Sequence, residues 1–403
     1  MVVSTTENKP RFSALYVKEF RHYFIAQAIS LSGTWIHQTA AGWLVYSMTK
    51  SSLYLGLLGV SLSLPILLFT LIGGVLADRF KKRELLILTQ ALSIIPATVF
   101  ALLLAFNIIN IWEILAISFF LGVINSIDTP VRQSFLIEIA GRNNILNAVA
   151  LSSVIFHMAR MAGPVIAGFV ISHFGFSICF ILNAVTFLPV VYVLIKMTLR
   201  CDDKKPAKQS LLKDFSDGLV YVIRFRRIAF ILVTITVFSL FCIPYGHFMP
   251  VFVDRVFHSD VVGLGYLMSA TGAGAFAAGF VIAYAGDIKN KRKLMSITGL
   301  IFPLSLFAFC FVKNFTLAMF LLALAGFNLV SFLAAANSYI QLKVQDSIRG
   351  RVMSVYTLMF LGMAPAGSAL IGSLAQVWGI EKTLALTTSI SLTGFLIFRR
   401  KWK

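Results

Sequence analysis

Residues 73–83 read Gly-Gly-Val-Leu-Ala-Asp-Arg-Phe-Lys-Lys-Arg and end an apolar run that begins at Leu55. The run is long enough for one helix to cross a hydrocarbon core of about 30 Å. A carboxylate, Asp78, stands at the boundary, and a dense cluster of cations follows it. Because cytoplasmic loops of membrane proteins collect Lys and Arg, the cluster predicts that this helix ends in the cytoplasm. Gly74, one turn before Asp78, has no side chain, so we expect a neighbouring helix to approach the backbone there.

The composition indicates a membrane protein along the whole chain. Of the 403 residues, 58% are hydrophobic and 13% are charged, whereas soluble proteins carry about 25% charged residues. The apolar residues fall in runs of about twenty, each long enough to cross a bilayer. We therefore expect an all-α membrane protein with twelve transmembrane helices, at roughly 22–46, 55–77, 84–106, 111–132, 145–171, 176–197, 228–253, 261–286, 292–312, 315–341, 352–376 and 383–398.

The net charge of +19 is explained by topology and not by a nucleic-acid partner. Thirty of the 35 Lys and Arg residues fall on one side of the predicted membrane, in both terminal segments and in alternate loops. The positive-inside rule then places both termini in the cytoplasm, as in a multi-pass protein of the bacterial inner membrane. Contact with anionic lipid headgroups is a further use for these cations. The first twenty residues are polar, and no cleavable signal is evident.

The four cysteines are scattered along the chain, three of them in apolar runs. They form neither a disulfide framework nor a metal-ligand cluster, so we expect no metal and no cofactor. The sequence also lacks a Gly-x-Ser-x-Gly element, a His-Glu-x-x-His element and a clustered acidic pair. An enzyme embedded in the membrane would need such a set, so we do not expect an enzyme.

An internal repeat divides the chain into two halves. A shift of 204 residues superposes four glycines on four others, namely Gly122 on Gly326, Gly163 on Gly367, Gly168 on Gly372 and Gly175 on Gly379. The only long polar stretch lies between the halves, and its part from Ser210 to Phe225 has apolar residues on one helical face. This part predicts an interfacial amphipathic helix, or else an ordinary loop helix. We expect a six-helix bundle at 1–197, a cytoplasmic linker at 198–227 and a second six-helix bundle at 228–403.

These features carry a family resemblance. The spacing of Gly74, Leu76, Asp78 and Arg79 resembles the loop 2–3 signature of the major facilitator superfamily, and a weaker copy begins at Gly286-Asp287. Lys and Arg gather at the cytoplasmic end of many membrane-spanning helices, so the cations alone are weak evidence for the family. The position of the acidic residue Asp78 within the signature is more specific. Lys81 replaces the usual Gly of the signature, so we expect the turn after Phe80 to have a different backbone conformation.

Further stretches resemble the subfamily that includes enterobactin-type siderophore exporters and macrolide efflux pumps. They are 33–38 (Gly-Thr-Trp-Ile-His-Gln), 43–46, 129–133, 160–168 and 349–352. The resemblance implies a monomeric secondary transporter that exports a siderophore or a related polar or anionic metabolite by proton-coupled alternating access. A macrolide-type multidrug efflux pump and an importer of siderophores or lipids are the alternatives. A channel would lack the two-bundle repeat.

The resemblance places a gate at the cytoplasmic helix ends. It implies that Asp78 faces the start of the eleventh helix near Arg351 and latches the halves when the cavity opens outward. Asp287 with Arg292 is the counterpart in the second half. The gating set is Gly74, Asp78, Arg79, Arg132, Asp287, Arg292 and Arg351. These charges have an alternative role in stabilising a static surface.

In the fifth helix, Gly163, Pro164 and Gly168 combine small residues with a missing backbone hydrogen bond. Antiporter branches of the superfamily have a similar element that bends this helix between the halves. We expect either a hinge-like packing element or a passive packing kink here.

Ionisable side chains are costly inside a bilayer and are therefore candidates for function. The substrate or proton candidates are His37, Gln38, Asp128, His157, Arg160, Asn328 and Asn337. Arg160 is either a substrate contact or a structural anchor, and the two histidines are either functional or packing residues. The middle of the first helix has no carboxylate, so the cavity favours anionic or neutral polar ligands over lipophilic cations. His37, His157 or Asp128 would carry the coupled proton.

Overall fold

A computed structural model describes residues 13–141, 144–197, 211–285 and 290–402, which are helical with short connections and contain no strand. The predicted residue Asp287 lies outside the described residues. The first group of helices consists of η1 (Ser13–Tyr16), α1 (Lys18–Thr49), α2 (Ser52–Arg79), α3 (Lys82–Ala105), α4 (Ile111–Ala140), α5 (Ile145–Phe174) and α6 (Phe176–Lys196). The linker contributes α7 (Leu211–Arg224). The second group consists of α8 (Arg226–Phe241), η3 (Ile243–Phe248), α9 (Met249–Arg255), α10 (Val261–Ala285), α11 (Lys291–Phe309), α12 (Phe315–Lys343), α13 (Asp346–Leu361), α14 (Ala364–Trp378) and α15 (Ile380–Trp402).

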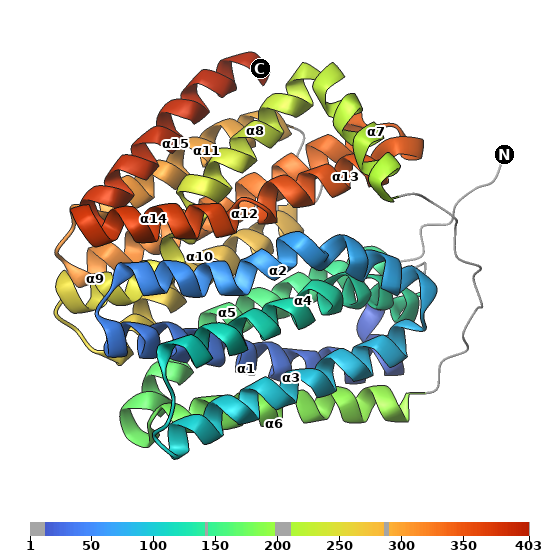
Figure 1. Cartoon of the computed structure of the whole chain (residues 1–403). Coiled ribbons are helices and arrows are strands. Elements are labelled where there is room, and N and C mark those ends of the chain that lie inside the picture. The colour runs from blue at the N-terminus through green and yellow to red at the C-terminus, as the bar shows by residue number, and fades with distance from the viewer. Residues whose placement is uncertain (1–12, 142–143, 198–210, 286–289, 403) are drawn as a thin grey trace.

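The helices make the twelve crossings that the sequence predicts. Among the described residues, ten stretches are long and apolar enough to span a membrane. Helices α1 and α15, of 32 and 23 residues, run beside them and complete the set (Figure 1). One predicted boundary is wrong, because α4 continues to Ala140 instead of ending near Arg132. Phe135, Leu136 and Ile139 recur at helical spacing in this extension and are buried, so packing prolongs the helix.

Two crossings are interrupted, which the apolar runs did not predict. The seventh consists of α8, η3 and α9, and Pro244 and Pro250 stand at the starts of its second and third pieces. The eleventh consists of α13 and α14, which meet at Gly362 and Met363, and Pro365 lies in the first turn of α14. Proline cannot donate the backbone hydrogen bond that a continuous helix needs, so each interruption falls where a proline begins the next piece.

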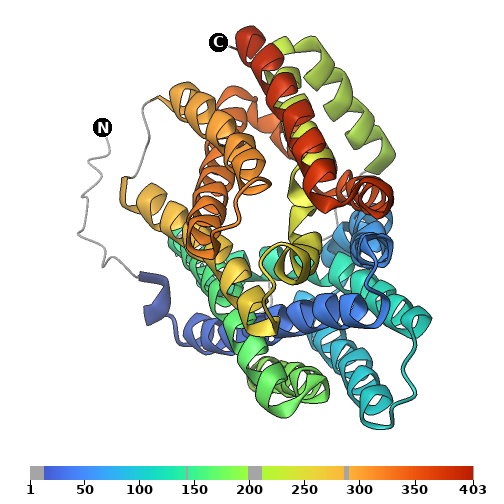
Figure 2. The ribbon, with the colours of Figure 1, turned by 90° about the vertical axis from the view of Figure 1, so that its left-hand side faces the viewer.

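The helices pack as two groups that meet along two helix pairs (Figure 2). Within the first group, α2 packs on α4, α3 on α6, and α1 on α5 and α6. Within the second group, α10 and α11 pack on α12, and α8 packs on α15. Between the groups, α5 packs along α10 and α2 packs along α14. Helix α7 lies against α13, at the end of the molecule that we call the linker end. The opposite end, where α1 turns into α2, is called the hairpin end.

The 204-residue repeat is visible in the contacts of its glycines. A Cβ on Gly168 would lie 2.9 Å from the carbonyl oxygen of Val261 in α10. A Cβ on its counterpart Gly372 would lie 2.9 Å from the Cα of Gly56 in α2. Gly175 and Gly379, also related by the repeat, both have a left-handed backbone, with φ of 82° and 81°. The repeat therefore marks equivalent places where helices of the two groups touch or where a crossing begins.

We predict that Gly56→Ala lowers the melting temperature of the purified protein. The new Cβ would lie 2.6 Å from the carbonyl oxygen of Ser368 and 3.0 Å from the Cα of Gly372, so α2 must move away from α14. Overpacking of this kind costs about 1–3 kcal/mol. Gly74→Ala in the same helix is the matched control, because a Cβ there meets no atom within 4 Å. Equal melting temperatures for the two variants would contradict the close approach of α2 and α14.

Candidate functional site

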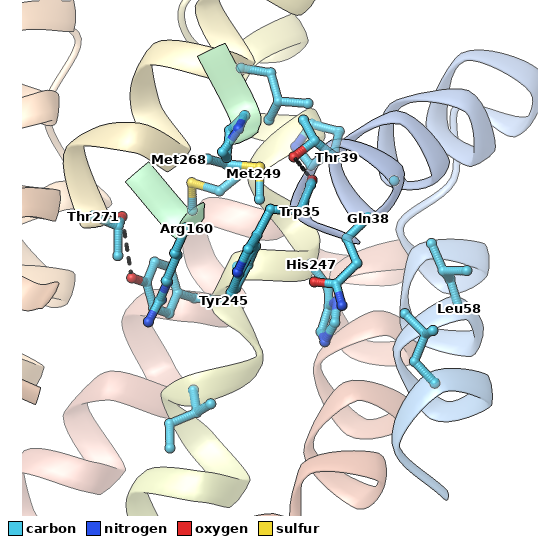
Figure 3. Close-up of a pocket in the computed structure, with 17 residues that line it drawn as sticks. Trp35, Gln38, Thr39, Leu58, Arg160, Tyr245, His247, Met249, Met268 and Thr271 are labelled. Carbon is cyan, nitrogen blue, oxygen red and sulfur yellow. Dashed lines mark hydrogen bonds between the residues drawn. The ribbon is translucent and has the colours of Figure 1, made fainter. Parts of the chain in front are cut away.

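A cavity of about 190 Å³ lies where the two groups of helices meet. Its walls come from α1, α2 and α5 of the first group and from η3, α9 and α10 of the second (Figure 3). Its polar lining consists of Gln38, Thr39, Arg160, Tyr245, His247 and Thr271, and Trp35, Met249 and Met268 are among its apolar lining residues. Because both groups contribute walls, a relative movement of the groups would change the shape of the cavity.

Arg160 supplies the only full charge among the described residues that line this cavity. Its guanidinium carbon lies 5.5 Å from the centre of the Trp35 ring, within range of a cation–π interaction. In Figure 3 the Arg160 side chain crosses the Tyr245 ring in this view, and Trp35 lies beside it. The Tyr245 hydroxyl is directed toward the Thr271 hydroxyl, at 3.5 Å. An arginine that stacks on an aromatic ring keeps its N–H donors available, so this site can bind an anionic group.

A second cavity, of about 710 Å³, lies toward the linker end between the start of α5 and helices α12 and α13. His157, one turn before Arg160, lines this second cavity, as do Asn337 and Gln341. The Gln341 amide donates a hydrogen bond to the Asn337 side-chain oxygen. Nδ1 of His157 is buried and has no hydrogen-bond partner among the described residues. His157 and Arg160 thus line the two cavities from neighbouring turns of α5.

His37 and Asn328 lie away from both cavities. His37 is buried, contacts the Asn183 amide at 3.2 Å and packs edge-on against Phe100 and Phe180. The Asn328 amide donates to the carbonyl oxygen one turn earlier in α12. Packing contacts explain both side chains, whereas Gln38, the neighbour of His37, lines the central cavity.

Asp128 ties α4 to α3 inside the first group. Its carboxylate is almost fully buried and accepts hydrogen bonds from the Thr89 hydroxyl at 2.8 Å and the Gln90 amide at 2.9 Å. Its second oxygen lies 3.4 Å from the Arg132 guanidinium, one turn along α4. This arrangement satisfies a buried charge with a cation and two donors, as an anchor between helices requires. Arg160 is not part of this anchor and lines the central cavity.

The predicted gating residues lie at the linker end, but only some of their contacts are described. The side chain of Asp78 lies outside the described residues. Arg79 and Arg292 are exposed at the ends of α2 and α11. Arg351 at the start of α13 pairs with Asp217 of the linker helix α7 at 2.9 Å, and the contact between Asp78 and Arg351 stays a prediction.

The close helix approach expected at Gly74 is found at Gly73 instead. A Cβ on Gly73 would lie 2.9 Å from the Cα of Ile127 in α4, whereas one on Gly74 would meet no atom within 4 Å. The cationic cluster after α2 also has local structural contacts. Arg83 donates to the carbonyl oxygens of Leu194 and Ile195, at 2.6 and 2.7 Å, and so caps the end of α6.

The predicted packing element in α5 lies at contacts with both groups. A Cβ on Gly163 would lie 3.3 Å from the carbonyl oxygen of Ser32 in α1, and Gly168 faces Val261 of α10. The carbonyl oxygen of Pro164 lies against Gly265, also in α10. Helix α5 is continuous through Pro164, so these residues let α5 approach its neighbours closely on both sides.

A polar cluster at the hairpin end joins the two groups, and the sequence did not single it out. The Asp254 carboxylate of α9 accepts a hydrogen bond from the Tyr46 hydroxyl at 2.8 Å and pairs with the Lys50 ammonium at 3.0 Å. Arg255 donates to the carbonyl oxygen of Lys50 at 3.2 Å. Beside them, the Ser51 hydroxyl donates to Gln376 at 2.8 Å. The only signal in the sequence was that the charged residues Lys50 and Arg255 lie in loops on the side of the membrane that is expected to be poor in charge.

The cavity residues of the seventh crossing were also missed. Tyr245 and His247 line the cavity from η3, the short 3-10 piece between α8 and α9. The signal that could have found them is the run Pro244-Tyr-Gly-His-Phe-Met-Pro250 inside an apolar span. Broken helices in transporters tend to line binding sites, because irregular backbone is tolerated only beside a cavity or within the protein.

The sequence matches a family profile described as "Transmembrane secretion effector" over residues 10–401. The chain belongs to this family of major facilitator superfamily transporters. Proteins of this superfamily move solutes and are not enzymes. The family thus agrees with the two groups of helices and with the cavity between them.

Three relatives of the transporter cover nearly its whole length. The staphyloferrin A transporter of Staphylococcus aureus is 25% identical over 94% of this chain and 96% of its own. The multidrug efflux pump Tap of Mycolicibacterium fortuitum is 25% identical over 90% of this chain and 91% of its own. The enterobactin exporter EntS of Shigella flexneri is 23% identical over 94% of this chain and 89% of its own.

Solved structures show the same fold at lower identity. A bacterial homologue of the lysosomal transporter Spinster, in an inward-facing unoccupied conformation, has a TM-score of 0.73 and 14% identity, over 96% of this chain and 98% of its own. A POT family transporter in complex with 5-aminolevulinic acid has a TM-score of 0.77 and 12% identity, over 98% of each chain. At these identities the likeness concerns the fold alone.

We predict that Asp128→Asn destabilises the transporter. The change removes the charge that Arg132 faces and leaves a half-buried cation without its partner, which costs about 3 kcal/mol when such a pair is broken in a protein interior. Glu138→Gln in the same helix is the control, since the Lys82–Glu138 pair is more exposed and contributes less than about 1 kcal/mol. The free energy of unfolding in mild detergent, measured with a denaturant series, separates the two. A loss no greater for Asp128→Asn than for Glu138→Gln would contradict the anchoring role.

Proposed function

We propose that the transporter exports a small polar molecule, anionic or neutral, from the cytoplasm by proton-coupled alternating access. A siderophore or a related anionic metabolite is the favoured substrate. The observation that carries this proposal is Arg160, stacked on Trp35 in a cavity that both groups of helices line. An arginine fork binds carboxylates and other planar anions with two parallel hydrogen bonds, and no acidic side chain among the described lining residues competes for it.

The names of two relatives support the substrate class. One is a transporter of staphyloferrin A and another is an exporter of enterobactin. An acidic, oxygen-rich molecule would fit a cavity with one cation, three hydroxyl groups and an amide in its lining. Export is the direction named for the enterobactin relative.

The charge distribution supports an inner-membrane topology with the linker end in the cytoplasm. Helix ends and connections at the linker end carry most of the basic residues, and bacterial membrane proteins keep such loops in the cytoplasm. In this orientation the larger cavity opens toward the cytoplasm, and the polar cluster around Asp254 closes the outer side. We infer that the two groups of helices act as the halves that rock about the site, as a monomer.

His157 is the preferred carrier of the coupled proton. It lines the cavity at the linker side, its Nδ1 has no partner among the described residues, and Arg160 lies one turn further along α5. A proton on His157 would place a second cation one turn from the Arg160 guanidinium, so protonation of His157 would be coupled to the position of Arg160. His37 and Asp128 are less suited, because other side chains already surround both groups inside the first bundle.

A multidrug efflux pump is the second candidate, and the apolar part of the lining favours it. Trp35, Tyr245, Met249 and Met268 line the cavity. Methionine and aromatic side chains adapt to ligands of different shape, and the relative from Mycolicibacterium fortuitum is named as a multidrug pump. An importer of siderophores or lipids would use the same cavity in the opposite direction.

We predict that Arg160→Gln strongly reduces accumulation of an anionic siderophore in inside-out membrane vesicles energised with a proton gradient. Loss of a charge-assisted hydrogen bond costs about 2 kcal/mol, or roughly thirtyfold in affinity. Arg160→Lys keeps the charge without the planar fork, so we expect it to retain part of the transport. Lys313→Gln, an exposed change at the hairpin end, is the control and should transport as the wild type does.

Three outcomes of the vesicle assay would overturn parts of the proposal. Accumulation that persists in the presence of a protonophore would exclude proton coupling. Accumulation of a macrolide but not of any siderophore would favour the multidrug pump. Accumulation only in right-side-out vesicles would favour import.

A further inference from the structure

Basic residues from two distant segments gather beside the linker helix. Arg224 ends α7, Arg226 and Arg227 begin α8, and Arg400 and Lys401 lie near the end of α15. Figures 1 and 2 show the end of α15 beside the junction of α7 and α8. The Lys401 ammonium lies 5.3 Å from the centre of the Phe230 ring in the first turns of α8. We call these five cations the basic patch.

Exposed apolar side chains lie next to the basic patch. Val220 and Ile223 on the outer face of α7 are 62% and 66% exposed, and Phe225 at the junction is 47% exposed. Phe230 stacks on Phe398 of α15, with ring centres 5.9 Å apart, and so connects the two segments. Cations that alternate with exposed apolar side chains at a helix end are typical of surfaces that lie in the headgroup region of a membrane.

The basic patch has no acidic partner among the described residues. In the part of the chain that the structure describes, no carboxylate pairs with any of the five cations, whereas Lys82, Arg132 and Arg351 each have one. The neighbouring Arg399 is half-buried, and its buried Nε has no hydrogen-bond partner among the described residues. Several unpaired cations close together repel one another, so an anion that binds them relieves that repulsion.

We propose that the basic patch is a binding site for the headgroup of one anionic phospholipid. The phosphate lies among Arg224, Arg226, Arg227 and the end of α15, and the acyl chains lie along Val220 and Ile223. A phospholipid satisfies both parts of the surface at once, because its charge and its apolar chains are joined in one molecule. A soluble phosphate would satisfy only the cations.

The site bears on the position of the linker helix. On its inner face, α7 is held by the Asp217–Arg351 ion pair and by the close approach of Gly218, where a Cβ would lie 2.6 Å from the Arg351 carbonyl oxygen. A lipid on the outer face therefore presses α7 between the membrane and α13. The bound lipid therefore stabilises the arrangement in which Arg351 pairs with Asp217 of the linker helix.

The test is a titration of the full-length protein in neutral detergent with short-chain phosphatidylglycerol, with phosphatidylcholine as the neutral comparison, and native mass spectrometry as the readout of bound lipid. We expect the wild type to bind one phosphatidylglycerol in preference to phosphatidylcholine. Each basic residue near an anionic headgroup strengthens binding about fivefold. Arg226→Gln with Arg227→Gln should then weaken phosphatidylglycerol binding roughly 25-fold, with the melting temperature unchanged.

A matched control removes the same charge from the same end of the molecule. Arg21 and Lys343 are exposed cations of α1 and α12 outside the basic patch, and Arg21→Gln with Lys343→Gln should leave binding unchanged. A second variant, Arg400→Gln with Lys401→Gln, tests the segment at the end of α15. It should also weaken phosphatidylglycerol binding, because both segments contribute cations to the site. Equal weakening in the control would show a diffuse charge effect and overturn the site. Equal affinity for both lipids, or full displacement of the lipid by inorganic phosphate at the same concentration, would also overturn it.

Discussion

Asp254 joins the two groups of helices at the hairpin end, where its carboxylate binds the Tyr46 hydroxyl of α1 and the ammonium of Lys50, the residue after α1. Glycine contacts beside this cluster let α2 and α14 lie backbone to backbone. The interaction is modest in energy, because an exposed ion pair contributes less than about 1 kcal/mol and a hydrogen bond to a charged group about 1.5–3 kcal/mol. In the alternating-access cycle that we propose, this contact would break and form again, and a modest energy suits it. With the hairpin end closed, the cavity can open only toward the linker end.

The linker end has its own set of interactions in this arrangement. Helix α13 contacts α7 through Arg351 and Asp217, and the larger cavity separates the start of α5 from α12 and α13. If the halves rock as we propose, closure of this cavity would bring the end of α2 toward α13, and Asp78 is the partner of Arg351 that the family resemblance implies there. The two ends then compete, because the halves can close at one end only by separating at the other.

Much of the fold could be predicted from the sequence, because helix spans leave a strong pattern of twenty apolar residues and basic loops. The repeat of Gly168 and Gly372 even marked the contacts between the groups. The interruption at Tyr245 and His247 was missed, because a proline inside an apolar run also occurs within continuous helices such as α5. Spacing along the chain could not show that His37 packs between phenylalanines or that Asp254 reaches α1. Both depend on which helices are neighbours.

The central claim is that the Asp254 cluster keeps the hairpin end closed. Its most direct test is a distance measurement by pulsed electron resonance, with spin labels on Leu53→Cys and Val377→Cys at the hairpin end of a variant without native cysteines. Both positions are exposed. Wild type should give one short distance, and Asp254→Asn should add a longer one, since a loss of about 2 kcal/mol shifts a two-state equilibrium roughly thirtyfold. Identical distance distributions for wild type and Asp254→Asn would contradict the account.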